Sequence, residues 1–128
     1  MYGFNVNVSG KFDEVVTQVT EALKSEGFGV LSDIDVQATL KAKLGVERRP
    51  YRILGACNPT LAHRALEADP DIGLLLPCNV IIREEDNGSV TVGFMDPEAV
   101  LGLVQKEQVA KLGHEVRAKL VRVRDALH

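Results

Sequence analysis

Residues 78–95 read CNVIIREEDNGSVTVGFM, and this stretch decides the fold. Two apolar runs, Cys78–Glu84 and Ser89–Met95, flank the dipeptide Asn87-Gly88. Asn-Gly favours a tight hairpin turn because both residues tolerate the positive φ angles that this turn requires. We therefore expect two adjacent antiparallel strands here, in a sheet that is not purely parallel.

The remaining chain alternates strand and helix patterns on both sides of this hairpin. We expect strands at Tyr2–Val8, Phe28–Ile34 and Tyr51–Cys57, and helices at 12–26, Val36–Leu44 and Pro59–Ala68. A further helical turn is expected at Asp71–Leu76, and a last helix from Asp96 nearly to the C-terminus, with a bend near Glu107. The order β-α-β-α-β-α-β-β-α predicts an α+β fold: two layers, a mostly antiparallel sheet, and helices packed on one face.

Length and composition are those of one globular domain, which we assign to residues 1–128. The chain has 45% hydrophobic and 26% charged residues, enough to form a core without disulfides or metals. No apolar run approaches the roughly 18 residues of a membrane span. The first ten residues, MYGFNVNVSG, lack the basic and apolar regions of a secretory signal, so we expect a cytoplasmic location and two reduced cysteines.

The net charge of −3 hides an uneven distribution along the chain. Residues 41–64 carry six basic side chains against one acid, whereas residues 65–98 carry one basic side chain against eight acids. The sequence pI of about 5.6 argues against a nucleic-acid-binding protein, which usually shows a basic face and a high pI. The uneven charge is compatible with capture of a small anion or with self-association.

Two related tripeptides, Cys57-Asn58-Pro59 and Pro77-Cys78-Asn79, close one predicted strand and open another. If these strands are antiparallel neighbours, both Cys-Asn pairs meet at one edge of the sheet, beside the start of the Pro59–Ala68 helix. Free N–H groups at a helix start favour anions. We therefore predict a pocket for a small polar or anionic ligand, with six candidate binding residues: Arg52, Cys57, Asn58, His63, Cys78 and Asn79.

Three other interpretations of these residues stay open. Asn58 could simply cap a helix while both cysteines fill the core. Alternatively, Cys57, Cys78 and His63 could form a reactive-thiol or metal-dependent enzyme site, or the protein could be a structural interaction module that uses its last helix. The sequence contains no phosphate-binding loop, GxSxG or HExxH motif. We therefore assign no catalytic residue, cofactor or resident metal, and leave open whether the protein is an enzyme.

Several blocks of this sequence resemble the domain of unknown function 302 family. They are Gly27–Leu31, Lys43–Gly45, Pro50–Pro59, Ile72–Val80 and Met95–Pro97, with Ala62 and Leu66 between them. The resemblance spans nearly the whole chain and implies a TATA-binding-protein-like, two-layer α+β domain that forms a homodimer. It implies no catalytic residues. It does not imply DNA binding either, because the predicted strands offer only Arg52 and Arg83 as basic side chains.

Overall fold

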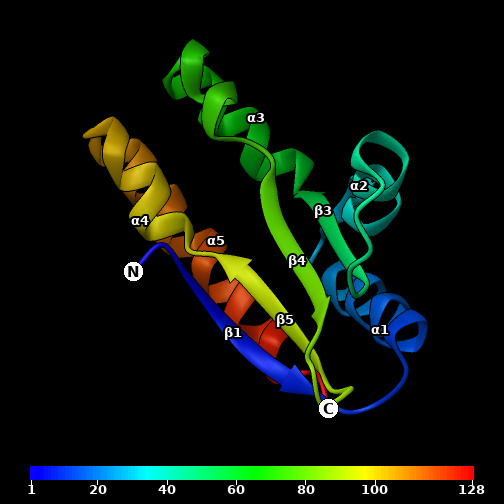
Figure 1. The fold of residues 1–128 in the computed structure, drawn as a ribbon. Coiled ribbons are helices and arrows are strands. Elements are labelled where there is room, and N and C mark those ends of the chain that lie inside the picture. The colour runs from blue at the N-terminus through cyan, green and yellow to red at the C-terminus, as the bar shows by residue number, and fades with distance from the viewer.

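Five strands form one antiparallel sheet in the computed structural model, which describes residues 1–128 (Figure 1). They are β1 (Gly3–Val8), β2 (Gly29–Asp35), β3 (Tyr51–Cys57), β4 (Cys78–Glu84) and β5 (Val90–Met95), in the spatial order β1-β5-β4-β3-β2. The predicted hairpin joins β4 to β5, and Gly88 in its turn has a φ of 87°. The predicted fold class is confirmed.

Helices α1 (Phe12–Ser25) and α5 (Glu107–Asp125) contact each other and pack on one face of the sheet (Figure 1). The other helical segments are α2 (Val36–Leu44), α3 (Pro59–Ala68), α4 (Pro97–Leu101) and the short 3-10 helices η1 (Pro70–Leu75) and η2 (Gly102–Val104). The core lies between the layers, where completely buried side chains meet: Val80, Ile82 and Val92 from the sheet, Val19 and Leu23 from α1, and Val109 and Leu120 from α5. None of these helices combines the length and apolar character of a membrane span.

Polar side chains fix where the middle helices begin. Asp35 accepts a hydrogen bond from the Ala38 N–H at 2.9 Å, and Asn58 accepts one from the Leu61 N–H at 3.3 Å. Each satisfies a backbone donor that has no partner inside its own helix. Pro59 follows Asn58 at the first helical position, where its lack of an N–H costs nothing. The predicted starts of α2 and α3 are therefore confirmed.

The predicted last helix is instead two segments, which is a correction to the sequence analysis. The chain leaves helical geometry after η2, where Gln105 has a φ of 60°, and then doubles back so that α4 lies against α5. Gly113 permits this close packing, since a Cβ atom there would lie 3.0 Å from the Pro97 carbonyl oxygen. The ion pair between Arg117 and Asp96, at 3.3 Å, also joins the two segments.

A β-bulge interrupts the pairing of the edge strand β2 with β3. Val30 pairs with Ala56 and Ser32 pairs with Gly55, so Leu31 is an extra residue between them. A bulge bends a strand and redirects the side chain of the unpaired residue. Leu31 is accordingly 72% exposed, although it is a large hydrophobic residue in a strand.

The sheet face opposite α1 and α5 carries no helix over β1, β4 and β5 (Figure 1). The registers place Ile34, Ile53 and Ile81 side by side on this face, and Gly93 follows in the same row. The Ile81 side chain lies over Gly93, where a Cβ atom would be 2.9 Å from Ile81 Cγ1. A continuous apolar row therefore crosses β2, β3 and β4 on the uncovered face.

Replacing Gly55 by alanine should destabilise the protein by about 1–3 kcal/mol. A Cβ atom at this position would lie 2.8 Å from Pro77 Cγ and would also overlap the Ser32 hydroxyl. Urea denaturation of Gly55→Ala and Gly29→Ala measures the effect. Gly29 is the matched control, since it also lies in a strand and nothing surrounds its Cβ position within 4 Å. Equal stability of the two variants would contradict the packing described here.

Candidate functional site

The ends of β3 and β4 form one side of a cavity of about 270 Å³. The two strands are antiparallel neighbours with Ala56 opposite Cys78, so Cys57 and Cys78 lie at the same edge of the sheet, as predicted. Fifteen residues line the cavity, of which thirteen are hydrophobic: Phe28, Leu31, Ala56, Cys57, Leu61, Ala62, Ala65, Leu66, Leu76, Cys78, Leu101, Leu112 and Val116, together with Asn58 and Pro77.

Several elements contribute the walls of this cavity. One side of α3 supplies Leu61 and Ala65, both buried, and α5 supplies Leu112 and Val116. Leu31 and Leu66 are the only lining residues whose side chains are exposed, at 72% and 44%. Because the other lining residues are buried or half-buried, these two leucines mark the mouth of the cavity, between the β2 bulge and α3.

Asn58 is the only polar side chain among the lining residues, and both ends of its amide are engaged. Its Oδ1 accepts from the Leu61 N–H, and its Nδ2 donates to the Glu26 carbonyl oxygen at 3.4 Å. Asn58 therefore caps α3 and joins it to the segment before β2. No buried side-chain nitrogen or oxygen in the protein lacks a hydrogen-bond partner.

The structure separates the six predicted site residues. Cys57, Asn58 and Cys78 line the cavity, whereas Arg52, His63 and Asn79 do not. Asn79 pairs in register with Gly55, points to the uncovered sheet face and lines a different surface depression there.

Arg52 and His63 have other surroundings. Arg52 donates from Nε to the Asp33 carboxylate at 2.7 Å, and this hydrogen bond holds the pKa of Asp33 below its ordinary value. His63 is exposed on α3. Neither residue is placed to bind a ligand inside the cavity.

Sequence reasoning missed most of the apolar lining. Leu112 and Val116 lie within the predicted last helix and were assigned no part in a site from the sequence. Leu31 lines the cavity because of the bulge, for which no sequence signal was recognised. A signal was nevertheless present in the sequence. Val30, Ser32 and Ile34 occupy one face of the predicted strand, and Leu31 is a large apolar residue on the other face, which should be polar if only one face is buried.

One alternative was a reactive or metal-binding centre built on the two thiols. Burial raises the pKa of Cys78 to about 11, with a smaller contribution from the charge of Cys57, so this thiol stays protonated at neutral pH. A thiolate is the form that attacks electrophiles and binds metals. No group of three or more histidine, cysteine or acidic side chains is arranged to hold a metal ion, so His63 does not complete a site with the cysteines.

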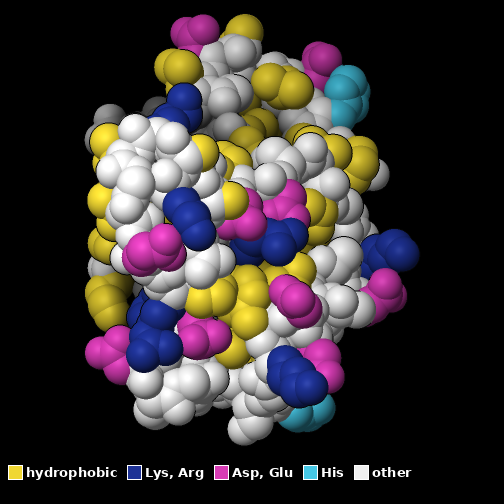
Figure 2. Space-filling view, turned by 45° about the vertical axis from the view of Figure 1, so that its right-hand side comes forward, with side chains coloured by type: hydrophobic (Ala, Val, Ile, Leu, Met, Phe, Trp, Pro, Cys, Tyr) yellow, Lys and Arg dark blue, Asp and Glu magenta, His cyan; other side chains and the backbone are white.

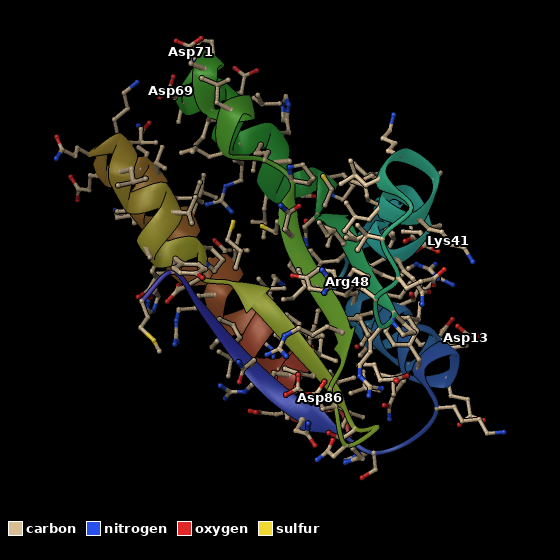
Figure 3. All side chains as sticks on the ribbon, in the orientation of Figure 1. Asp13, Lys41, Arg48, Asp69, Asp71 and Asp86 are labelled. Atoms are coloured by element: carbon tan, nitrogen blue, oxygen red, sulfur yellow. The ribbon has the colours of Figure 1, made fainter.

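Acidic side chains pair with most of the basic residues between positions 41 and 64. Lys41 pairs with Glu47 at 3.3 Å, Arg49 with Glu84 at 3.0 Å, and Arg64 with Glu115 at 3.2 Å. Figure 2 shows Lys and Arg side chains next to Asp and Glu across this side of the molecule. Figure 3 shows Lys41 beside α2 and Arg48 near β3, well apart from Asp69 and Asp71 at the far end of α3. The basic residues thus form no continuous basic surface.

The fold and the cavity define a two-layer α+β domain with an apolar pocket at the edge where β3 ends and β4 begins. Residues 4–127 match the family described as "Domain of unknown function DUF302", and the chain belongs to this family.

Two known proteins are similar to this chain. The crystal structure of an uncharacterized conserved protein DUF302 from Bacillus stearothermophilus superposes with a TM-score of 0.92 and 29% sequence identity, over 100% of this chain and 99% of that one. An uncharacterized protein of Aquifex aeolicus (strain VF5) is 27% identical over 92 residues. That match covers 71% of this chain and 58% of the relative, so it spans little more than half of the relative's length.

The buried Cys78 thiol should make the protein less stable at alkaline pH. Above its ordinary pKa of 9.0 the unfolded chain loses this proton, whereas the folded chain keeps it up to about pH 11. The free energy of unfolding therefore falls as the pH rises, and Cys78 contributes about 2 kcal/mol to this loss between pH 8 and 10.5.

Urea denaturation at both pH values, compared between Cys78→Ala and Cys57→Ala, isolates this contribution. Cys78→Ala is expected to lose less stability on going to pH 10.5 than the control variant, in which the buried thiol remains. Identical pH dependence in the two variants would show that Cys78 ionises as freely in the folded protein as in the unfolded chain.

Proposed function

We propose that this protein is a binding module for a small, mainly apolar ligand that occupies the cavity at the ends of β3 and β4. The observation that carries the proposal is the lining itself, with thirteen hydrophobic residues among fifteen around about 270 Å³. Protein cores are normally packed with few voids larger than a water molecule. Ligand sites, by contrast, are concave, mostly apolar and formed before the ligand arrives.

The polar or anionic ligand predicted from the sequence has less support from the geometry. Asn58 occupies the start of α3 and already accepts the Leu61 N–H, which removes a donor that an anion would need. Arg52 is paired with Asp33 outside the cavity. An anion inside the apolar lining would lose its hydration without gaining partners, which is strongly unfavourable.

Filling the cavity should abolish binding without unfolding the protein. Ala62 lines the cavity and is half-buried, so Ala62→Leu places three extra carbon atoms in the ligand's space. The neutral apolar fluorophore 1-aminonaphthalene should bind the parent protein and gain fluorescence, and Ala62→Leu should weaken this binding at least about tenfold.

Ala118→Leu is the matched control, because Ala118 is exposed on α5 and does not line the cavity. This variant should bind the fluorophore like the parent protein. Circular dichroism and thermal unfolding establish that both variants are folded, and Ala65→Leu provides a second way to fill the space. Absence of fluorophore binding by the folded parent protein, or unchanged binding by both filled variants, would refute the proposed pocket.

We also propose that two copies of the chain associate through the uncovered sheet face, as the family resemblance implies for a homodimer. The supporting observation is the apolar row of Ile34, Ile53 and Ile81 on this face, which no helix covers over β4. Burial of such a row against a second copy removes apolar surface from water.

Light scattering during size-exclusion chromatography should give twice the 14.0 kDa mass of the chain. Ile81→Arg places a charge in the middle of the row and should return the mass to that of one chain. Leu103→Arg is the control, since Leu103 is 73% exposed on η2, outside the row, and this variant should keep the doubled mass. A parent protein that is monomeric at 100 µM would exclude this association.

A further inference from the structure

We propose that the ligand is a single-chain amphiphile, whose alkyl tail fills the cavity and whose polar head stays in water at the mouth between Leu31 and Leu66. This inference rests on the proposed function and names its ligand class. It comes from three observations: the polar atoms in the lining already have hydrogen-bond partners, the mouth lies between two exposed leucines, and the cavity has a limited volume.

The polar atoms of the lining leave nothing to hold a ligand's polar group inside. Asn58 is the single polar side chain, and its oxygen and nitrogen are already bonded to Leu61 and Glu26. Strand β3 pairs on both sides, with β2 and with β4, so the backbone of β3 offers no free edge. A buried polar head would therefore lose its hydrogen bonds to water without replacement, which costs several kcal/mol. The head must remain outside.

The mouth offers apolar surface to an alkyl chain that leaves the cavity. Leu31 projects from the bulge in β2 and Leu66 from the surface of α3, and both line the cavity while remaining exposed to water. The exposure of Leu31 is 72% without a ligand. An alkyl chain passing between the two leucines would cover apolar surface on each of them, which is favourable at roughly 25 cal/mol per Å².

The cavity has room for about ten carbon atoms. A dry apolar cavity of about 150 Å³ accepts benzene, with its six carbons, and this cavity measures about 270 Å³. Asp33 is paired with Arg52 and Arg64 is paired with Glu115, so neither pair offers a free charge that would select the charge of the head group. A ten-carbon chain with either a carboxylate or a hydroxyl head should therefore enter tail first.

Displacement of 1-aminonaphthalene from the parent protein by decanoate, 1-decanol and decanedioate tests the proposed orientation. The first two should displace the fluorophore below their micelle or solubility limits. Decanedioate has the same chain but a carboxylate at each end, so one charge would have to enter the apolar lining. It should bind at least about tenfold more weakly than decanoate.

Two leucine variants test the mouth. Leu31→Ala should weaken decanoate binding about fivefold, since it removes apolar surface that the chain would cover. Leu44→Ala is the control with matched exposure, 69% against 72%, outside the cavity, and its affinity should stay within about twofold of the parent protein.

The outcomes separate this inference from the proposed function. If 1-aminonaphthalene binds but neither decanoate nor 1-decanol displaces it, the pocket stands and the amphiphile is refuted. If decanedioate displaces the fluorophore as strongly as decanoate does, the inference that the polar head stays outside the cavity is refuted. Equal affinities of Leu31→Ala and Leu44→Ala would overturn the role of the mouth. If the fluorophore itself fails to bind, the proposed function fails first.

Discussion

The antiparallel pairing of β3 with β4 is the interaction on which the rest of the structure depends. These strands lie next to each other inside the sheet, and their residues 54, 56, 80 and 82 are part of the sheet's side of the core. The pairing brings the end of one strand and the start of the next to a single edge. The chain leaves that edge as α3 and returns to it through η1, so a helical layer necessarily stands over the strand ends. The cavity lies under this layer.

Small side chains at this edge keep the space open. Ala56, Ala62 and Ala65 line the cavity and fill little volume. Larger residues at the three alanines would bury more apolar surface, so the cavity is costly for stability. The core between α1, α5 and the middle of the sheet, with its many completely buried side chains, offsets that cost. One part of the continuous apolar interior is thus tightly packed and stabilises the fold, and another part forms the pocket.

Local signals made most of the fold predictable. Asn87-Gly88 fixed the hairpin, and Asn58-Pro59 fixed the start of α3, because each dipeptide constrains its own backbone angles. A bend near Glu107 was predicted, but the complete break at Gln105 was not, since it depends on packing between Pro97 of α4 and Gly113 of α5. For the site, the meeting of Cys57 and Cys78 followed from strand direction alone. The separation of Asn79 from Cys78 follows from strand alternation, which sends neighbouring side chains to opposite faces.

Asn58 shows why the residue types at this edge suggested a ligand chemistry different from the one proposed from the structure. An amide beside two thiols at a helix start is a reasonable recognition site for an anion when only the sequence is known. In the structure the amide links α3 to Glu26, and Gly27 has no side chain at the point where a Cβ atom would lie 2.9 Å from Asn58 Nδ2. The polar group is therefore used to close one end of the cavity. In the proposed binding module, what remains accessible is the apolar interior of the cavity, and selection among ligands would depend on shape and on the ability of a polar head to stay in water.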